Sequence, residues 1–261
     1  SVARVEVHGD VHGGWGDGIG IDFAGGTGAQ LDIRAGSVGA WSDIAIIEGG
    51  QALDFENSGT VTGMFDLGGG NDKLRNYGGG TIALRALVDN DGNQIRDTES
   101  VAIADFGAGT DSFDNQGILT LADAGDSGAW MTGKQVTHPG GGNSSIIQAG
   151  VEQGFLTHLE SFTNSGLITL QDGVAGDLLV ITDQADGKTK GANVFTSNGG
   201  ALALDVVLDD GSSKQSDILI LDKAVTGTGA TRVAIANAGG LGGQTTGDGI
   251  MVINVRDKSD A

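Results

Sequence analysis

A recurring pattern constrains this chain more than any other feature of its sequence. An apolar residue, a spacer, an asparagine, a second spacer and a glycine occur together around Asn57, Asn76, Asn115 and Asn164. The first step between asparagines is 19 residues, and the next two steps are 39 and 49. Self-similarity near 20 residues, or a multiple of it, is the signature of a stacked solenoid. We therefore expect an all-β fold, a right-handed parallel β-helix, in which 39 residues are a doubled unit.

The four asparagines are expected to share one structural corner of this β-helix. Equivalent positions in successive coils lie one strand spacing apart, about 4.8 Å. Asparagine suits a corner because it tolerates the left-handed conformation and because its amide can hydrogen-bond along a stack. The glycine that follows is expected to relieve a tight turn, and the flanking apolar residues are expected to point inward. This role is structural rather than catalytic.

The composition agrees with many short strands. The chain has 49 glycines, one proline, no cysteine and 5% aromatic residues, which suits strands joined by tight turns. A net charge of −20 repels phosphate backbones and anionic lipids. The sequence has no run of 18 apolar residues, the length that indicates a membrane-spanning helix. We therefore expect a monomer with no nucleic-acid partner and no membrane insertion by this segment.

Two segments interrupt the repeat and predict insertions, near residues 85–100 and 123–150, in a stem that covers residues 1–171. Insertions in a solenoid become loops on its flank, and such loops often carry binding functions. The second insertion contains Gly-Asp-Ser-Gly around Ser127, the nucleophile motif of chymotrypsin-like proteases. Because a protease triad needs its own double-barrel scaffold, we favour a glycine-rich turn there.

The first insertion contains alternating oxygen-bearing side chains that resemble a calcium loop. The candidate ligands are Asp89, Asp91, Asn93 and Asp97. The usual calcium pattern has glycine at the sixth position and a bidentate acid at the twelfth, where this chain has Gln94 and Ser100. A solvated acidic turn explains the same residues. Apart from this possible calcium ion, no cofactor is expected.

Other polar residues have simpler interpretations. Asp72 and Asp111 lie in glycine-rich segments 39 residues apart and are expected to shape turns by accepting backbone N–H groups. His8 and His12 are expected to share a strand face, where a metal pair is conceivable, but a third ligand is not identifiable. His138 and His158 are expected at the surface. A carboxylate pair of the kind that glycosidases use cannot be distinguished among the many aspartates.

The C-terminal part carries a family resemblance. The segments that carry it are Gly176–Ile181, Asn198–Asp210, Ser216–Leu221, Gly227–Gly240 and Gln244–Val255. In this order they resemble the autochaperone, or junction, segment of bacterial type V (classical) autotransporter passenger domains, over residues 172–256. The resemblance implies a C-terminal autochaperone cap that folds first and nucleates the β-helix of residues 1–171. Residues 257–261 are expected to form a tail.

The same resemblance implies a non-catalytic fragment of a secreted or surface-displayed passenger, which acts as a rigid stem and folding nucleus in an adhesin or host-interacting virulence factor. It implies a Gram-negative cell surface, or release after outer-membrane translocation. Expected partners are the passenger's own C-terminal β-barrel translocator and a host-cell surface or matrix protein or glycan. A linker helix and barrel are implied after residue 256, so we expect a cleaved product or excised fragment. The alternatives are a β-helical enzyme acting on polysaccharide and a passenger protease.

Overall fold

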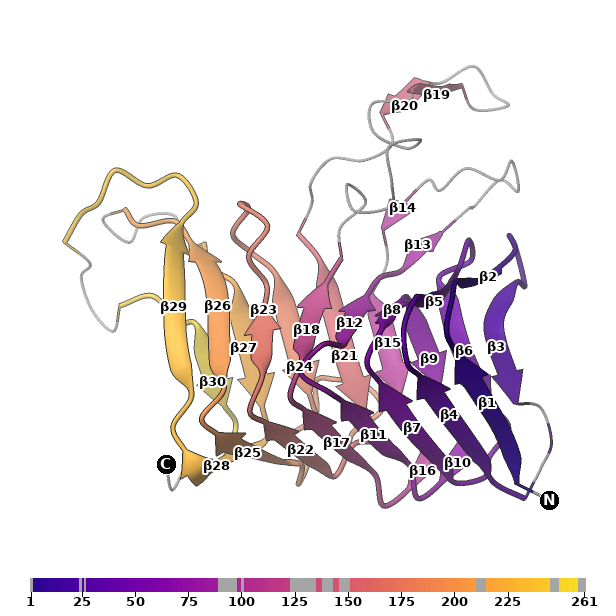
Figure 1. Ribbon diagram of the computed structural model, residues 1–261. Helices are drawn as coiled ribbons and strands as arrows, with labels where there is room; N and C mark the ends of the chain where they lie inside the picture. The colour runs from indigo at the N-terminus through magenta and orange to yellow at the C-terminus, as the bar shows by residue number, and fades with distance from the viewer. Residues whose placement is uncertain are drawn as a thin grey trace.

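Three parallel sheets of eight strands each enclose a single elongated core in the computed structural model (Figure 1). The structure describes residues 2–23, 25, 27–88, 98–99, 101–122, 135–137, 143–145, 151–209, 215–244 and 249–257. The described residues form strands and connections and no helix, so none of them provides a long apolar helix that could cross a membrane. The predicted all-β parallel β-helix is confirmed.

Each sheet is a stack of short strands in parallel register. The first sheet contains β1 (Ala3–Val7), β4 (Ala29–Ile33), β7 (Leu53–Asn57), β11 (Lys73–Asn76), β17 (Ser112–Asn115), β22 (Ser161–Asn164), β25 (Val194–Asn198) and β28 (Lys223–Gly229). The second contains β2 (Val11–Gly13), β5 (Ser37–Ala40), β8 (Thr60–Thr62), β12 (Thr81–Leu84), β18 (Ile118–Leu121), β23 (Leu167–Thr169), β26 (Ala201–Val206) and β29 (Arg232–Asn237). The third contains β3 (Ile19–Phe23), β6 (Ile44–Glu48), β9 (Met64–Asp66), β15 (Ala102–Asp105), β21 (Gln153–Thr157), β24 (Leu178–Ile181), β27 (Ile218–Leu221) and β30 (Ile253–Val255).

The register corrects one prediction about the repeat. Each coil adds one strand to each sheet, so β11 pairs directly with β17 and Asn76 stands opposite Asn115. Their offset of 39 residues is therefore one coil with a long connection, not a doubled unit. The extra residues lie between β12 and β15 and include the antiparallel pair β13 (Leu87–Val88) and β14 (Thr98–Glu99). Sequence spacing overestimated the number of coils because the insertion was as long as a coil.

Both insertions leave the β-helix at the same corner, between the second and the third sheet. The second insertion follows β18, precedes β21 and contains the antiparallel pair β19 (Gln135–Thr137) and β20 (Asn143–Ser145). The labelled strands of both insertions lie above the ends of the second sheet in Figure 1. A different corner, between the third and the first sheet, holds the short parallel pair β10 (Gly69–Gly70) and β16 (Ala108–Gly109). The other corner, between the first and second sheets, holds the asparagines.

Inward-facing apolar residues stack along the axis and form the core. One register position of the first sheet is occupied in successive coils by Leu31, Phe55, Leu74, Phe113, Phe162 and Phe195. The ring centroids of Phe113 and Phe162 are 4.9 Å apart, a favourable aromatic contact. Burial of one such side chain stabilises the fold by about 1.5–3 kcal/mol. Because an apolar residue fills this inward position in successive coils, each of these coils contributes a buried side chain to the core.

The sheets continue without a break into the C-terminal part of the chain. Strand β21 pairs with β24, β22 with β25 and β23 with β26. Backbone hydrogen bonds therefore join the predicted stem to the segment predicted to cap it. The division at residue 171 stays a prediction, since the hydrogen bonding is continuous there.

Candidate functional site

A ladder of buried amides occupies one corner of the β-helix. Nδ2 of Asn57 donates to Oδ1 of Asn76 at 2.8 Å, and Nδ2 of Asn76 donates to Oδ1 of Asn115 at 2.8 Å. Nδ2 of Asn115 in turn donates to Oδ1 of Asn164, also at 2.8 Å. All four side chains are fully buried. The structure brings the four predicted corner asparagines together, and each of the first three donates to the asparagine of the next coil.

The backbone at this corner differs from the expectation. Asp43 and His158 are the described non-glycine residues with positive φ, so the asparagines are not left-handed. Three of the glycines that follow, Gly59, Gly117 and Gly166, have a different function from the one predicted, whereas a Cβ on Gly78 would have room. A Cβ on Gly166 would lie 2.2 Å from the backbone oxygen of Gly117, far inside van der Waals contact. Glycine is required here because successive coils approach closely, not because the turn needs positive φ.

Acidic residues form a second ladder at the corner between the third and the first sheet. Oδ1 of Asp72 accepts the N–H of Leu53, and Oδ1 of Asp111 accepts the N–H of Asp72, both at 2.6 Å. Oε2 of Glu160 accepts the N–H of Asp111 at 2.6 Å. Each acid immediately precedes a strand of the first sheet. The carboxylates therefore fasten each coil to its neighbour instead of shaping only their own turns.

Burial strongly perturbs the acids of this ladder. Burial raises the pKa of Asp72 from 3.8 to about 7, opposed by the Leu53 N–H and reinforced by the negative charges of Asp111 and Glu48. The pKa of Asp111 is raised to about 6, again chiefly by burial, with Glu160 adding to the rise. Oδ2 of Asp72 and Oδ2 of Asp111 are buried without a hydrogen-bond partner. Neutral carboxyl groups fit this corner better than charged ones.

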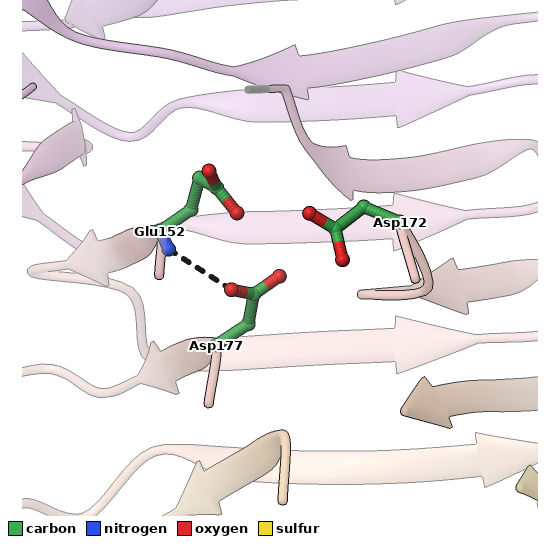
Figure 2. Close-up of side chains that lie close together, drawn as sticks. All are labelled: Glu152, Asp172 and Asp177. Carbon is green, nitrogen blue, oxygen red and sulfur yellow. Dashed lines mark hydrogen bonds between the residues drawn. The ribbon is translucent and has the colours of Figure 1, made fainter. Parts of the chain in front are cut away.

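A third set of acids lies before strands of the third sheet. Glu152 precedes β21, Asp177 precedes β24, and Asp172 approaches from the turn after β23 (Figure 2). One carboxylate oxygen of each residue lies within 4.8 Å of the others. The N–H of Glu152 donates to Oδ1 of Asp177 at 2.9 Å. Figure 2 shows the three carboxyl groups turned toward a common point.

Oxygen ligands of this kind suit a hard cation such as calcium, but calcium takes six to eight of them, and this cluster supplies three. Protonation of one carboxylate is sufficient to relieve the electrostatic repulsion among the three. Burial raises the pKa of Asp177 to about 7, against hydrogen bonds from Glu152, and the charges of Asp217 and Asp172 raise it further. Oδ1 of Asp172 also accepts the N–H of Val174 at 2.7 Å. We therefore interpret the cluster as another strand-fastening corner.

Sequence reasoning missed this cluster. Its members come from two coils and from the turn between two sheets, so no local spacing brings them together. A usable signal does exist, because an acidic residue directly precedes strands at the two acid-bearing corners. The register needed to align those acids comes only from the structure.

A groove of about 390 Å³ lies on the outer face of the second sheet. We call it the threonine groove and define it by Ser37, Gly39, Thr62, Thr81, Ala83 and Thr120, which line it across β5, β8, β12 and β18. His12 and Arg85 also contribute to its wall. No carboxylate is among the described residues that line it. The acid cluster therefore lies apart from this groove. A smaller groove of about 150 Å³ on the first sheet does contain carboxylates, those of Asp32, Asp54 and Glu56. Each of them forms an ion pair, Asp32 with Arg34 and both Asp54 and Glu56 with Arg75.

Of the histidines that the structure describes, His8 and His12 differ from expectation. His8 follows the end of β1 whereas His12 lies in β2, so the two do not share a strand. His158 was expected at the surface, and its side chain is 35% exposed, with Nδ1 2.6 Å from Oδ1 of Asp105. Its backbone is left-handed, with φ of 51°. The metal pair suggested by spacing at His8 and His12 is therefore not formed on a shared face.

Several predicted residues lie outside the described part of the chain. They are the calcium candidates Asp89, Asp91, Asn93 and Asp97, the protease-like Ser127, and His138. Calcium binding by the first group stays a prediction. If calcium binds there, millimolar calcium will raise the melting temperature, because a ligand specific to the folded state stabilises it.

Comparison with known proteins adds evidence on the C-terminal part. Residues 178–261, about a third of the chain, match the family described as Autochaperone Domain Type 1. The uncharacterised protein YuaQ of Escherichia coli (strain K12) is 36% identical over 111 residues, which are 42% of this chain and 7% of that protein. This chain thus spans a small fraction of that relative's length, and no solved structure matches. The chain therefore carries, over residues 178–261, the autochaperone segment of an autotransporter passenger.

Proposed function

We propose that this chain is a non-catalytic stem whose C-terminal coils act as its folding nucleus. The observation that carries the proposal is the position of the autochaperone match. It begins at β24 and includes the last two coils, whose strands pair directly with those of the preceding coil. Once folded, these coils present three parallel strand edges on which the preceding coil can assemble. In a solenoid, folding spreads through such nearest-neighbour contacts.

Folding kinetics of matched core variants test the nucleus. Leu202 in β26 and Leu119 in β18 occupy the same register position, and both are buried. Leu→Ala at a buried site costs about 2–5 kcal/mol. Leu202→Ala is expected to slow refolding, whereas Leu119→Ala is expected mainly to accelerate unfolding, because only nucleus contacts are formed in the transition state. The proposal is wrong if the two variants change refolding equally.

Truncation gives a second test. A chain that ends at residue 171 is expected not to refold from denaturant, because β21, β22 and β23 lose their partners β24, β25 and β26. Adding residues 172–261 as a separate chain is expected to restore some refolding. Circular dichroism after dilution from urea measures both outcomes. Efficient refolding of residues 1–171 alone would contradict a C-terminal nucleus.

We further propose that the passenger reaches the cell surface of a Gram-negative bacterium, or is released, through its own C-terminal β-barrel translocator. There it acts as an adhesin or virulence factor that binds a host-cell surface or matrix protein or a glycan. The autochaperone match supports the secretion route. Accessibility of the chain to antibody or protease on intact cells tests surface display. Binding of the purified chain to immobilised host-cell matrix, compared with the heat-unfolded chain, tests adhesion.

A further inference from the structure

We propose that the threonine groove binds a neutral oligosaccharide. This names one ligand class for the proposed host-binding role and rests on the proposed surface display. The groove floor consists of outward-facing residues in two neighbouring rows. Thr62, Ala83 and Thr120 share one register position. Ser37, Thr60, Thr81 and Ile118 share another, and of these Ser37 and Thr81 line the groove. Successive members of a row are about 4.8 Å apart. The floor is therefore a regular strip of small side chains, most of which carry a hydroxyl group.

The chemistry of the lining selects against ionic ligands. A hydroxyl group both donates and accepts hydrogen bonds, as the hydroxyl groups of a sugar do. The guanidinium of Arg85 pairs with the buried carboxylate of Asp43, 3.0 Å from its Oδ1. The described lining has no carboxylate of its own, and Asp10 beside it accepts the hydroxyl of Ser37 at 2.8 Å. The charge of −20 repels polyanions. An uncharged ligand rich in hydroxyl groups remains the best match.

The strands of the floor also select against a peptide added by strand pairing. Such a peptide needs a free backbone edge. Strand β8 pairs with both β5 and β12, and β12 pairs with both β8 and β18. Their backbone groups are therefore already engaged. Recognition at the groove must come from side chains.

Aromatic rings lie at one end of the groove. His12, in its wall, contacts Trp41 edge to face, with ring centroids 4.8 Å apart. Trp41 in turn stacks on Trp15 at 5.4 Å with an interplanar angle of 10°. Trp41 directly follows the end of β5, and its contact with His12 places its ring beside the wall of the groove. Amphipathic rings beside hydroxyl groups offer both the apolar and polar contacts that a sugar ring needs.

Filling the groove tests the proposal on the full chain. The purified protein is screened on a printed array of neutral hexose and N-acetylhexosamine oligosaccharides, with hexagalacturonate as the charged comparison. The tightest neutral binder is then titrated calorimetrically and is expected to have a Kd below about 1 mM, or 4.1 kcal/mol of binding free energy. Thr62→Trp and Thr120→Trp fill the groove, and each is expected to weaken binding by at least about tenfold, or 1.4 kcal/mol.

Two further variants complete the design. Thr163→Trp changes a half-buried threonine on the first sheet and is expected to leave the Kd unchanged. Thr62→Val removes one hydroxyl with little change in shape, and is expected to weaken binding even if a tryptophan variant fails to fold. The proposal is overturned if no neutral oligosaccharide binds, if hexagalacturonate alone binds, or if the folded groove variants bind like the wild type. Any of these results leaves the stem and folding-nucleus role intact, because that role is read from refolding rates.

Discussion

Nδ2 of Asn76 donates a 2.8 Å hydrogen bond to Oδ1 of Asn115, although 39 residues separate the two asparagines. The bond joins adjacent coils across the whole first insertion. The same bond joins the preceding pair of coils, from Asn57 to Asn76, and the following pair, from Asn115 to Asn164. An internal member of this ladder therefore has a partner on each side, and removal of one amide takes a hydrogen-bond partner from each neighbour.

Replacement of Asn115 by alanine tests the ladder. The variant leaves Oδ1 of Asn164 without the donor Nδ2 of Asn115, and it leaves Nδ2 of Asn76 with one acceptor, the backbone oxygen of Ile118, in place of two. A buried group left unsatisfied costs about 1–3 kcal/mol, so Asn115→Ala, with one such group and one further lost hydrogen bond, is expected to lose about 2–5 kcal/mol. Urea unfolding followed by circular dichroism measures the loss. Gln116→Ala, at the exposed neighbouring position, serves as the control and is expected to change stability by less than about 0.5 kcal/mol. If Asn115→Ala and Gln116→Ala lose the same free energy of unfolding, the amide stack stabilises the fold no more than an exposed side chain does.

The acidic ladder predicts a stability that falls as pH rises. The pKa of Asp72 is raised from 3.8 to about 7 in the folded protein. Between pH 3.8 and about pH 7 the folded state keeps a proton that the unfolded state has released. The stabilisation that comes from this raised pKa is therefore complete below about pH 4 and is lost by about pH 7. Burial raises the pKa of Asp111, Asp177 and Asp217 as well, so they contribute in the same direction. The urea midpoint is therefore expected to decrease from pH 5 to pH 8.

Asp72→Asn isolates this contribution. The amide can still accept the N–H of Leu53, which Oδ1 of Asp72 accepts in the wild type, but it does not ionise. The variant is expected to show a smaller decrease in urea midpoint between pH 5 and pH 8. Asp186→Asn is the control, because the pKa of exposed Asp186 is lowered to about 2 by hydrogen bonds from Thr189, outside the tested interval. A wild-type midpoint that rises with pH, or an unchanged slope in Asp72→Asn, would refute the proposed protonation.

Close packing between coils makes a prediction that distinguishes two glycines. A Cβ on Gly166 would lie 2.2 Å from the oxygen of Gly117, whereas the nearest atom to a Cβ on Gly78 is 3.9 Å away. Gly166→Ala must push two backbones apart, and such overpacking costs about 1–3 kcal/mol. Gly78→Ala has room and no positive φ, so it is expected to be neutral or to stabilise by about 0.4–1 kcal/mol. Thermal melting of both variants checks this, and similar destabilisation of the two would contradict it.

The sequence was sufficient to predict the parallel β-helix and the shared corner of the asparagines. Both follow from one repeated pattern whose residues have the same local surroundings in every coil. It was not sufficient to predict the number of coils, because the connection between β12 and β15 adds about as many residues as a coil contains. The length of that connection does not change the hydrogen bonding between coils, because closing a loop costs little extra free energy as the loop grows.

The acidic corners were only partly predictable for a related reason. Asp72 and Asp111 were recognisable as turn residues, but their acceptor roles depend on backbone N–H groups of a neighbouring coil. The meeting of Glu152 with Asp172 and Asp177 depends on register and on the direction of a turn. Local patterns specify coil geometry, whereas contacts across coils require the alignment of segments separated by insertions of unequal length.

A buried ion pair at the start of the first insertion gives the last prediction. Arg85 lies 42 residues from Asp43, and its Nε donates to Oδ1 of Asp43 at 3.0 Å. Oδ2 of Asp43 accepts the N–H of Leu87 at 2.7 Å, and the side chains of both charged residues are at most 8% exposed. Arg85→Met leaves a buried carboxylate without its cation, which is expected to cost about 3–5 kcal/mol.

A double-mutant cycle separates the loss of the pair from the burial of a lone charge. Asp43→Asn combined with Arg85→Met removes both charges, while the amide oxygen can still accept the N–H of Leu87. The double variant is therefore expected to be more stable than Arg85→Met alone in urea unfolding. Arg4→Met is the control, because Arg4 and Glu6 form an exposed pair at 2.7 Å, and exposed pairs contribute about 0–1 kcal/mol. If Arg85→Met costs no more than Arg4→Met, the buried pair does not fasten the insertion to the β-helix.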